Sequence, residues 1–285
     1  MPAEPDNYEW FHHRKPATIL GHALFVYDVQ PHAQAPTCVA QCAAPAVPLD
    51  AEAIREGFGR TDLRLASFDC SQSWLLPAGG QLPGWYVLRR ETTLTSNRFI
   101  HQRLSSAPLS YEQRTNRELP ALTIYEQAAP PPGSSCSAAL VTLDGPLSFR
   151  GYTVSKSSAR PGDTLEVETC WQVTTQPGRT VSPMLHLVGP NGAPRLVADG
   201  LGVPIEQWQA GDIIMQRHEI KIPSDAPAGN YQLLTGAYWL DTLKRWPVLS
   251  GDTLTLSPIM IEPPRLSRLR ALHLRGSLFC MSWSA

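Results

Sequence analysis

The sequence predicts a mainly β protein, with an immunoglobulin-like antiparallel β-sandwich in the C-terminal half and a small mixed α/β domain before it. Three observations support this prediction. The 285 residues include 27 prolines and 20 glycines, and such frequent chain breakers favour short strands joined by turns. Residues 165–173 alternate between two faces, which is the period of a half-buried strand. About seven short strand patterns, separated by turn residues, occupy the surrounding ~115 residues.

Composition and charge argue against several classes of function. The net charge is −1 and charged residues make up 17%, so we expect no attraction to nucleic acid. No apolar stretch reaches the ~18 residues of a membrane-spanning helix, and the best candidate, residues 17–27, contains Gly21 and His22. The N-terminus shows no signal peptide. If the native protein lies on the extracytoplasmic face of a membrane, we expect the chain to be part of a longer protein.

The first segment is predicted to run from a polar lead-in into one buried strand. Residues 1–16 are polar and contain three prolines. Residues 19–29 are apolar and rich in β-forming side chains, which indicates a strand buried over most of its length. Residues 30–48 contain four prolines, and we expect an ordered loop there.

Two short helices and four further strands complete the expected α/β domain. Asp50 can cap a helix through about Glu56, which Gly57 ends. Ser96 can cap a second helix over residues 97–104. The strands are predicted at residues 63–68, 73–76, 85–88 and 122–125.

A proline- and serine-rich segment, residues 128–144, is the predicted linker. Its first part reads Ala-Ala-Pro-Pro-Pro-Gly-Ser-Ser-Cys-Ser, and consecutive prolines prefer an extended conformation. We therefore expect the α/β domain over residues 1–127 and the sandwich over 145–262. Residues 263–285 form a basic tail in which arginines and leucines interleave, either a short amphipathic helix or a frayed terminus.

The sandwich strands are predicted from alternation and turn chemistry. In the central strand, Trp171 lies on the apolar face and is expected in the core. Glu166 and Glu168 share the polar face. Paired carboxylates can do acid/base work or bind calcium, but here we expect solvated charges. Asn191 and Gly192 favour positive φ and suit a hairpin turn. The other strands are predicted at residues 184–188, 214–222, 231–239 and 254–261.

The cysteines and histidines form no recognisable metal or catalytic motif. Cys38 and Cys42 lack a second close pair that would complete a zinc site. We expect structural thiols, Cys170 among them, although one disulfide among Cys38, Cys42 and Cys70 is an alternative. The six cysteines are Cys38, Cys42, Cys70, Cys136, Cys170 and Cys280. Nucleophile elbows, P-loops, dinucleotide fingerprints and HExxH motifs are absent from the sequence.

Of the eight histidines, His186 and His218 lie on predicted strands, where each either faces solvent or closes a core hydrogen bond. We expect no catalytic residue, no cofactor and no metal ion.

Four aromatic residues are the candidate glycan contacts. Tyr238 and Trp239 are neighbours on a predicted strand, so one of them should face outward. Trp208 and Trp246 have no clear pattern. An exposed aromatic platform binds sugars because their apolar ring faces stack on it while their hydroxyls find nearby polar groups.

Short motifs in a fixed order resemble a known family. In the second half they are FRGY (149–152), RPGDTL (160–165), the strand of Trp171, HLVGPNG (186–192), WQAGD (208–212), IPSDAPAGNY (222–231) and GAY (236–238). In the first half they are SFD (67–69), WLLP (74–77) and WYVL (85–88). This series resembles the C-terminal extracytoplasmic region of bacterial membrane glycosyltransferases of the dolichyl-phosphate-mannose-protein mannosyltransferase type, over most of residues 17–262. That family's catalytic acidic residues lie in its membrane-embedded half, so the resemblance carries over no catalytic residue.

These observations lead to three functional hypotheses. The first is a non-catalytic accessory region of a membrane glycosyltransferase that uses lipid-linked sugars. It would position glycan or acceptor, with a glycan or lipid-linked sugar and the membrane-embedded portion as partners. The alternative is a free-standing carbohydrate-binding or adhesion module. The third is an enzyme with its site between the two halves, near Asp62, Asp69 and His101.

Overall fold

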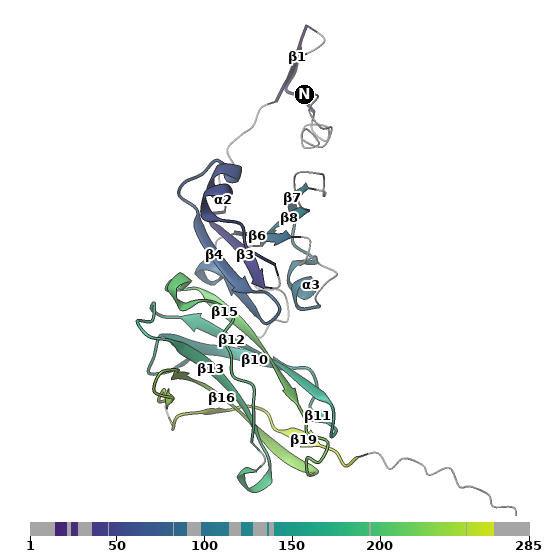
Figure 1. The fold of residues 1–285 in the computed structure, drawn as a ribbon, viewed down its shortest axis with the longest axis vertical. Coiled ribbons are helices and arrows are strands. Elements are labelled where there is room, and N and C mark those ends of the chain that lie inside the picture. The colour runs from purple at the N-terminus through teal and green to yellow at the C-terminus, as the bar shows by residue number, and fades with distance from the viewer. Residues whose placement is uncertain are drawn as a thin grey trace, which may run out of the picture.

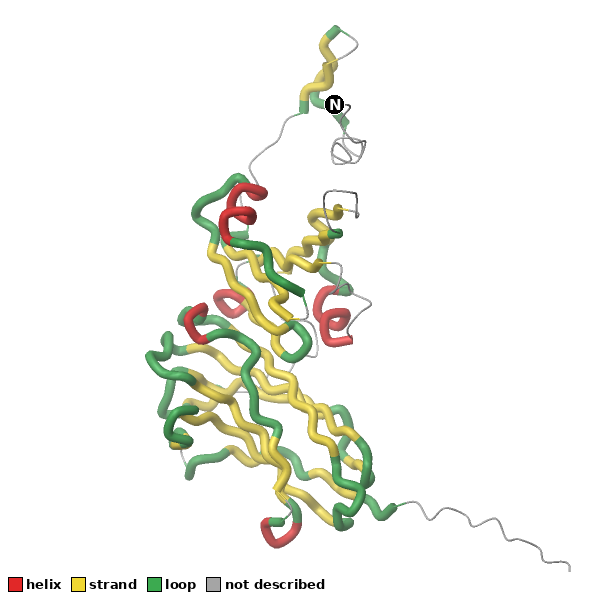
Figure 2. The backbone as a smooth tube through the Cα atoms, in the orientation of Figure 1, coloured by secondary structure: helices red, strands yellow, loops and turns green. Residues whose placement is uncertain are grey.

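The computed structural model shows a mainly β protein, as predicted (Figure 1). The described residues are 15–21, 24–27, 36–44, 46–81, 83–89, 98–113, 121–127, 136, 140–193, 195–248 and 250–264. Only two α-helices occur among these residues, and strands form most of the regular structure (Figure 2). Neither helix has the length and apolar character needed to cross a membrane.

A five-stranded mixed sheet with two helices forms the α/β part, above the sandwich in Figure 1. The strand order is β4-β3-β6-β8-β7, and β3 is parallel to both neighbours. On one face, Ile54 of α2 packs in a small cluster with Val39 and Val87. On the other face, Ile100 and Leu104 of α3 join the large core. The bounds are β3 Cys38–Ala44, α2 Ala51–Phe58, β4 Arg64–Asp69, β6 Gly84–Arg89, α3 Arg98–Leu104, β7 Leu109–Gln113 and β8 Leu122–Gln127.

Strand β3 corrects the prediction of a loop over residues 30–48. It is the parallel strand between β4 and β6, and both Val39 and Ala40 are fully buried. A strand buried on both faces shows no alternation of polar and apolar residues. Its three alanines are also poor strand formers. The local pattern therefore favours a loop, and only the neighbouring strands make this segment a strand.

Helix α2 begins where the sequence predicts and ends later. The Asp50 side chain accepts a hydrogen bond from the Ala53 N–H at 2.8 Å, so the predicted N-cap is confirmed. The helix passes through Gly57 and ends before Gly59, whose φ is 61°. The Gly59 N–H donates to the carbonyl of Glu56. The left-handed glycine therefore ends the helix, two residues beyond the predicted one. The expected cap of α3, Ser96, lies outside the described residues.

Two sheets packed face to face form the sandwich. The first has the order β5-β15-β12-β10-β9. The second has the order β11-β19-β16-β13-β14, and β17 and β18 also pair with β16. Among the described pairs of these two sheets, only β11 and β19 run parallel. The bounds are β5 Ser73–Leu76, β9 Val141–Thr142, β10 Leu147–Val154, β11 Ser158–Ala159, β12 Thr164–Val173, β13 Val181–Val188, β14 Arg195–Val197, β15 Ile213–Lys221, β16 Gly229–Trp239, β17 Lys244–Arg245, β18 Leu254–Thr255 and β19 Ile259–Ile261.

The predicted strand pattern of the sandwich is confirmed at its centre and altered at its end. Leu165, Val167 and Trp171 of β12 are at most 1% exposed. Asn191 turns the chain between β13 and β14 with φ of 60°, as its sequence predicts. The single strand expected over residues 254–261 is instead two short strands on either side of Pro258, which has no N–H to donate to a ladder.

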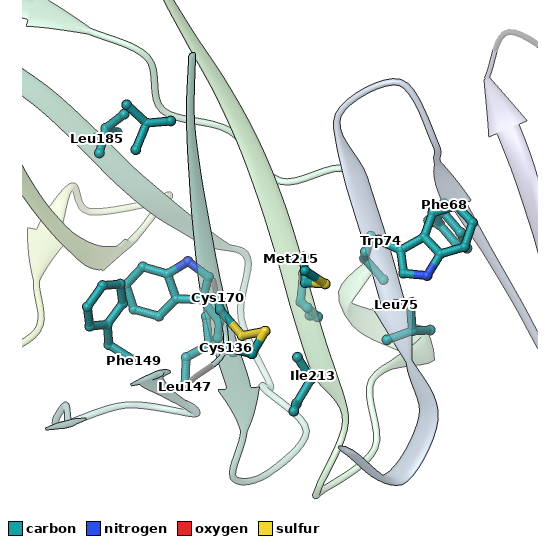
Figure 3. Packing of buried hydrophobic residues seen from close by; sticks show 14 of the residues in the cluster. Phe68, Trp74, Leu75, Cys136, Leu147, Phe149, Cys170, Leu185, Ile213 and Met215 are labelled. Carbon is teal, nitrogen blue, oxygen red and sulfur yellow. A yellow bond between two sulfur atoms is a disulfide. The ribbon is translucent and has the colours of Figure 1, made fainter. Parts of the chain in front are cut away.

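The α/β part and the sandwich share one sheet and one core. Strand β5 comes from the N-terminal half but pairs with β15 at the edge of the first sandwich sheet. Trp74 of β5 is fully buried and stacks on Tyr86 of β6, with 4.8 Å between the ring centroids. Figure 3 shows apolar side chains continuing from Phe149 past Met215 to Trp74. The two parts are therefore packed together, although a boundary between them was predicted in sequence.

The predicted linker is described only at Cys136 and from residue 140 onward. Cys136 is buried and bonded to Cys170 of β12. Strand β9, near the end of the segment, pairs with β10. The segment is therefore tied to the sandwich at two places. The position of the domain boundary stays a prediction.

The sequence predicts a single buried strand over residues 19–29, whereas the described residues of this segment form a small hairpin. Strands β1 (Thr18–Leu20) and β2 (Leu24–Val26) pair antiparallel. Gly21 follows β1 with φ of 57°, a left-handed conformation that glycine adopts at turns. The strands are also exposed rather than buried. The apolar residues do form strands, but these strands do not pack in the core.

Two disulfide bonds correct the interpretation of the cysteines as structural thiols. Cys42 is bonded to Cys70, which lies within the alternative set, and Cys136 is bonded to Cys170. The second bond joins residues 34 apart, and pairing between distant segments cannot be deduced from spacing. Cys38 is buried and free, and its burial raises the pKa of the thiol to about 11.

Peptide mapping without reduction should find two linked pairs, Cys42 with Cys70 and Cys136 with Cys170. Replacing Cys136 and Cys170 together by serine should lower the free energy of unfolding by about 2–4 kcal/mol, because the unfolded chain is no longer constrained. Urea denaturation would measure the loss. Alkylation of all four residues in unreduced, denatured protein would contradict the pairing.

Candidate functional site

An open groove of about 550 Å³ lies between the α/β part and the sandwich. One wall comes from the end of β4 and the turn after it, with Asp69 and Gln72. The other wall comes from residues 180–182, where β13 begins. Residues 200–206 also line the groove. A concave surface with apolar walls and a few polar groups is the usual form of a ligand site, so this groove is the candidate site.

A glycine packed against strand β5 fixes the segment that lines the groove. A Cβ added at Gly202 would lie 2.4 Å from the Ser73 Oγ atom, so a larger residue does not fit. The Gly202 N–H donates to Ser73 Oγ at 3.0 Å and to Gln216 Oε1 at 3.2 Å. Its carbonyl accepts a hydrogen bond from the Asp69 N–H at 2.8 Å. The segment is therefore bound to both parts of the molecule.

Two carboxylates and exposed apolar side chains face this groove. The Asp69 carboxylate accepts hydrogen bonds from the Ser71 N–H and hydroxyl and from the Gln72 amide at 2.6–3.0 Å. These donors hold it in place, and a carboxylate still has acceptor capacity for a ligand hydroxyl. Glu206 lines the groove and is exposed. Leu240 is 47% exposed and adds apolar surface.

Two of the four candidate aromatic contacts are core residues, which corrects the prediction. Trp208 and Trp246 are each 1% exposed. The Trp208 indole N–H donates to the carbonyl of Val203 at 3.2 Å, so this residue supports the groove from inside. Trp246 packs edge-on against Trp239, with 5.0 Å between the ring centroids. A buried ring offers no face to a sugar.

Tyr238 and Trp239 are both half-buried, whereas the sequence predicts that one faces outward. The Tyr238 hydroxyl donates to Asp199 Oδ2 at 3.1 Å. The Arg179 guanidinium lies over the Trp239 ring, 4.8 Å from its centroid, as a cation–π contact. Protein groups already engage both residues, so neither is an open stacking platform in this structure.

The sequence analysis did not identify Asp199, a partly buried carboxylate beside the groove. Asp199 accepts a hydrogen bond from the Leu185 N–H at 2.9 Å and pairs with His186 Nε2 at 3.2 Å, and it also accepts the bond from Tyr238. Burial raises the pKa of Asp199, but these hydrogen bonds outweigh burial and hold the pKa below its usual range. Ser182 of β13 lies opposite Tyr238 in the sheet and lines the groove near this cluster. Asp199 follows a three-residue strand, where no pattern singles it out.

His218 closes a chain of core hydrogen bonds, one of the two alternatives for it. It is 3% exposed. Its Nδ1 lies 2.6 Å from the Ala198 carbonyl and its Nε2 lies 2.9 Å from the Thr169 hydroxyl. The Trp171 indole N–H donates to that same hydroxyl. A neutral ring with its proton on Nδ1 satisfies all three bonds, and burial lowers the pKa of His218 to about 4.

The low pKa of His218 predicts that acid destabilises the fold. The unfolded histidine takes up a proton near pH 6.5 and the folded one only near pH 4. The unfolded state therefore binds more protons in this window, and the free energy of unfolding should fall by about 3 kcal/mol as the pH drops through it. Urea denaturation across this range would measure the slope. A His218→Gln variant should show a flatter slope, and an equal slope would contradict the assignment.

The residues of the enzyme hypothesis are not gathered into one site. Asp62 pairs with Arg60 on the surface, and His101 is exposed on α3. Only Asp69 lines the groove. Within the described part of the chain, no three His, Cys, Asp or Glu side chains are placed to hold a metal ion.

The two glutamates of β12 form ion pairs, whereas solvated charges are predicted. Glu166 pairs with Arg217 at 2.9 Å and stays partly exposed. Glu168 pairs with Arg103 of α3, whose side chain is only 4% exposed. The difference arises because α3 covers part of the outer face of the first sandwich sheet. Neither pair lies in the groove.

Comparisons with known proteins find distant structural likeness. Neither a family model nor a curated protein matches the sequence. The crystal structure of the C-terminal domain of wzt is similar over 52% of this chain and 92% of that one, with 12% identity and a TM-score of 0.30. Spo0M, a sporulation control protein from Bacillus subtilis, is similar over 42% and 49% of the two chains, with 14% identity and a TM-score of 0.23. At these identities and TM-scores, neither likeness carries information on function.

Proposed function

We propose that this chain is a non-catalytic accessory region that binds a glycan in the groove between its two parts. The proposal is supported above all by the groove itself, which combines an open volume of about 550 Å³ with mostly apolar walls and carboxylates at its surface. Sugar rings have apolar C–H faces and hydroxyl edges, so they bind where apolar surface and hydrogen-bond acceptors lie together.

Each group in the groove has a role in this proposal. Leu201 and Leu240 provide apolar contact for a sugar ring face. Asp69 and Glu206 accept hydrogen bonds from hydroxyls. Because the groove is open, little of the ligand is enclosed, and affinities near millimolar are expected. Such weak binding suits a region that holds a glycan or an acceptor near another catalytic centre.

More specifically, we propose that the catalytic centre served by this region belongs to a glycosyltransferase that uses lipid-linked sugars. It is supported by the ordered motifs that resemble the extracytoplasmic region of such enzymes. The two disulfides support folding outside the cytoplasm, because such bonds persist in oxidising compartments. In the full protein, a membrane-embedded portion would supply the catalytic residues. Reading the gene upstream in frame for hydrophobic helices distinguishes this assignment from a free-standing binding module.

Glycan titration of the purified chain tests the site. A double variant, Glu206→Gln with Leu240→Ser, removes one acceptor charge and one apolar contact, and we expect at least about tenfold weaker binding. Both side chains are exposed, so the fold should be preserved. Glu52→Gln, an exposed change on α2, is the matched control. Unchanged affinity in the double variant would exclude the groove as the glycan site.

An assay with a polyprenyl-phosphate sugar donor tests the accessory role. We expect no transfer or hydrolysis by this chain alone. Turnover above a no-protein control, lost in an Asp69→Asn variant, would replace the accessory role with catalysis in the groove.

A further inference from the structure

The hairpin of β1 and β2 is separate from the rest of the fold. Figure 1 shows it at one end of the molecule, beyond the five-stranded sheet. None of its described residues belongs to either hydrophobic core cluster. A lone two-stranded hairpin is at best marginally stable in water. Exposed apolar residues grouped in this way indicate a surface that something else covers.

Both faces of the hairpin are apolar. Ile19 lies opposite Phe25 on one face, and Leu20 lies opposite Leu24 on the other. These four side chains are 52–60% exposed. A docked protein groove covers one face of a ribbon, whereas lipid chains surround both. The two-sided pattern therefore favours a lipid surface over a protein partner.

Chain composition around the hairpin fits a membrane interface. Arg14 and Lys15 precede the hairpin, but Glu9 and Asp28 border the same stretch, so residues 9–28 carry no net charge. Trp10 comes before the hairpin and Tyr27 follows it. Tryptophan and tyrosine are enriched at the membrane interface. Apolar side chains, and not charge, would therefore provide the attraction to lipid.

The length of the hairpin matches shallow insertion. Strands of three residues reach about 10 Å, and interfacial segments are buried to a depth of about 5–10 Å. At this depth, water and headgroups can still hydrogen-bond the outer backbone edges, which deeper hydrocarbon would not allow. We propose that the hairpin inserts into the interface of a lipid membrane and holds the α/β part at its surface.

Vesicle flotation with the full chain tests this proposal directly. The probes are vesicles of phosphatidylcholine alone and vesicles of equimolar phosphatidylcholine and phosphatidylglycerol. We expect comparable binding to both, with little dependence on salt, because exposed apolar side chains and not charge drive the insertion. The assay is run at about pH 7.5.

Variants of each face separate lipid from protein partners. Ile19→Ser with Phe25→Ser changes one face, and Leu20→Ser with Leu24→Ser changes the other. In a lipid interface, each pair should weaken vesicle binding by about tenfold or more. The matched control, Val197→Ser with Leu243→Ser, changes two exposed apolar residues of the sandwich that are 58% and 69% exposed. It should bind like the wild type.

These assays distinguish membrane insertion from docking on a second copy of the chain. Loss of vesicle binding in both face variants, with an unchanged melting temperature, supports insertion. Binding that only one face variant weakens, or that the control weakens equally, overturns it. A dimer in analytical ultracentrifugation that the face variants abolish, with no vesicle binding, would assign the hairpin to a second copy of the chain. Glycan titration is unaffected by any of these results, so the proposed function is tested separately.

Discussion

Replacing Trp171 with alanine should unfold the sandwich or lower its free energy of unfolding by about 3–5 kcal/mol. Trp171 is fully buried and packs edge-on against Phe149, with 5.1 Å between the ring centroids. The substitution leaves a cavity between the two sheets. It also removes the indole donor to the Thr169 hydroxyl, which is itself bonded to His218. Packing and hydrogen bonding are therefore lost together.

Urea denaturation of Trp171→Ala and Glu166→Ala measures the contrast between the two faces of β12. Glu166 is partly exposed and pairs with Arg217, and exposed ion pairs contribute about 0–1 kcal/mol. We therefore expect Glu166→Ala to change stability by less than about 1 kcal/mol. Similar losses in both variants would show that Trp171 does not occupy the core. Circular dichroism distinguishes a folded, destabilised variant from an unfolded one.

The sandwich could be predicted from sequence because its central strand alternates between a buried and a polar face, and because turn residues mark strand ends. Trp171 and its neighbours alternate along β12, and Asn191 marks a turn with positive φ. Strand β3 lacks such a signal, since both its faces are buried and its composition is small and apolar. Its strand conformation therefore depends on pairing with β4 and β6, which the local sequence does not show. The same holds for Cys136 and Cys170, whose bond depends on a distant segment reaching β12.

The candidate site could not be predicted, because the groove is assembled from segments far apart in the chain. Asp69, Ser182 and Leu240 come from different elements, and residues 200–206 have no strand or helix pattern of their own. The sequence analysis located the candidate site from aromatic side chains, but Trp208 is buried in the structure. A tryptophan outside a regular strand shows its burial only through tertiary packing.

One buried carboxylate links the two parts of the molecule, in addition to the pairing of β5 with β15 and the shared core. Asp212 is 1% exposed and accepts hydrogen bonds from both terminal nitrogens of Arg64, at 2.7 and 2.5 Å. It also accepts from the N–H groups of Gln209 at 2.9 Å and Ala78 at 3.2 Å. Arg64 belongs to β4, whereas Asp212 precedes β15. This ion pair therefore joins the α/β part to the sandwich.

Replacing Asp212 with alanine should cost about 3–5 kcal/mol, because it leaves a largely buried arginine and two backbone donors without their partner. The matched control is Asp241→Ala, which removes a bidentate partner from Arg179 on the surface, where both side chains are about half exposed. That change should cost less than about 1 kcal/mol. Urea denaturation measures both losses, and equal losses would contradict the buried role of Asp212.

Limited proteolysis gives a second readout of the same interface. We expect cleavage within residues 128–137, in the first part of the predicted linker. In the wild type, the fragments should stay together on size exclusion, because β5 completes the sandwich sheet and Arg64 binds Asp212. In Asp212→Ala, the weakened interface should let a share of the fragments separate. Complete separation in the wild type would mean that the halves fold independently, and the pairing of β5 with β15 would then contribute little to the stability of either.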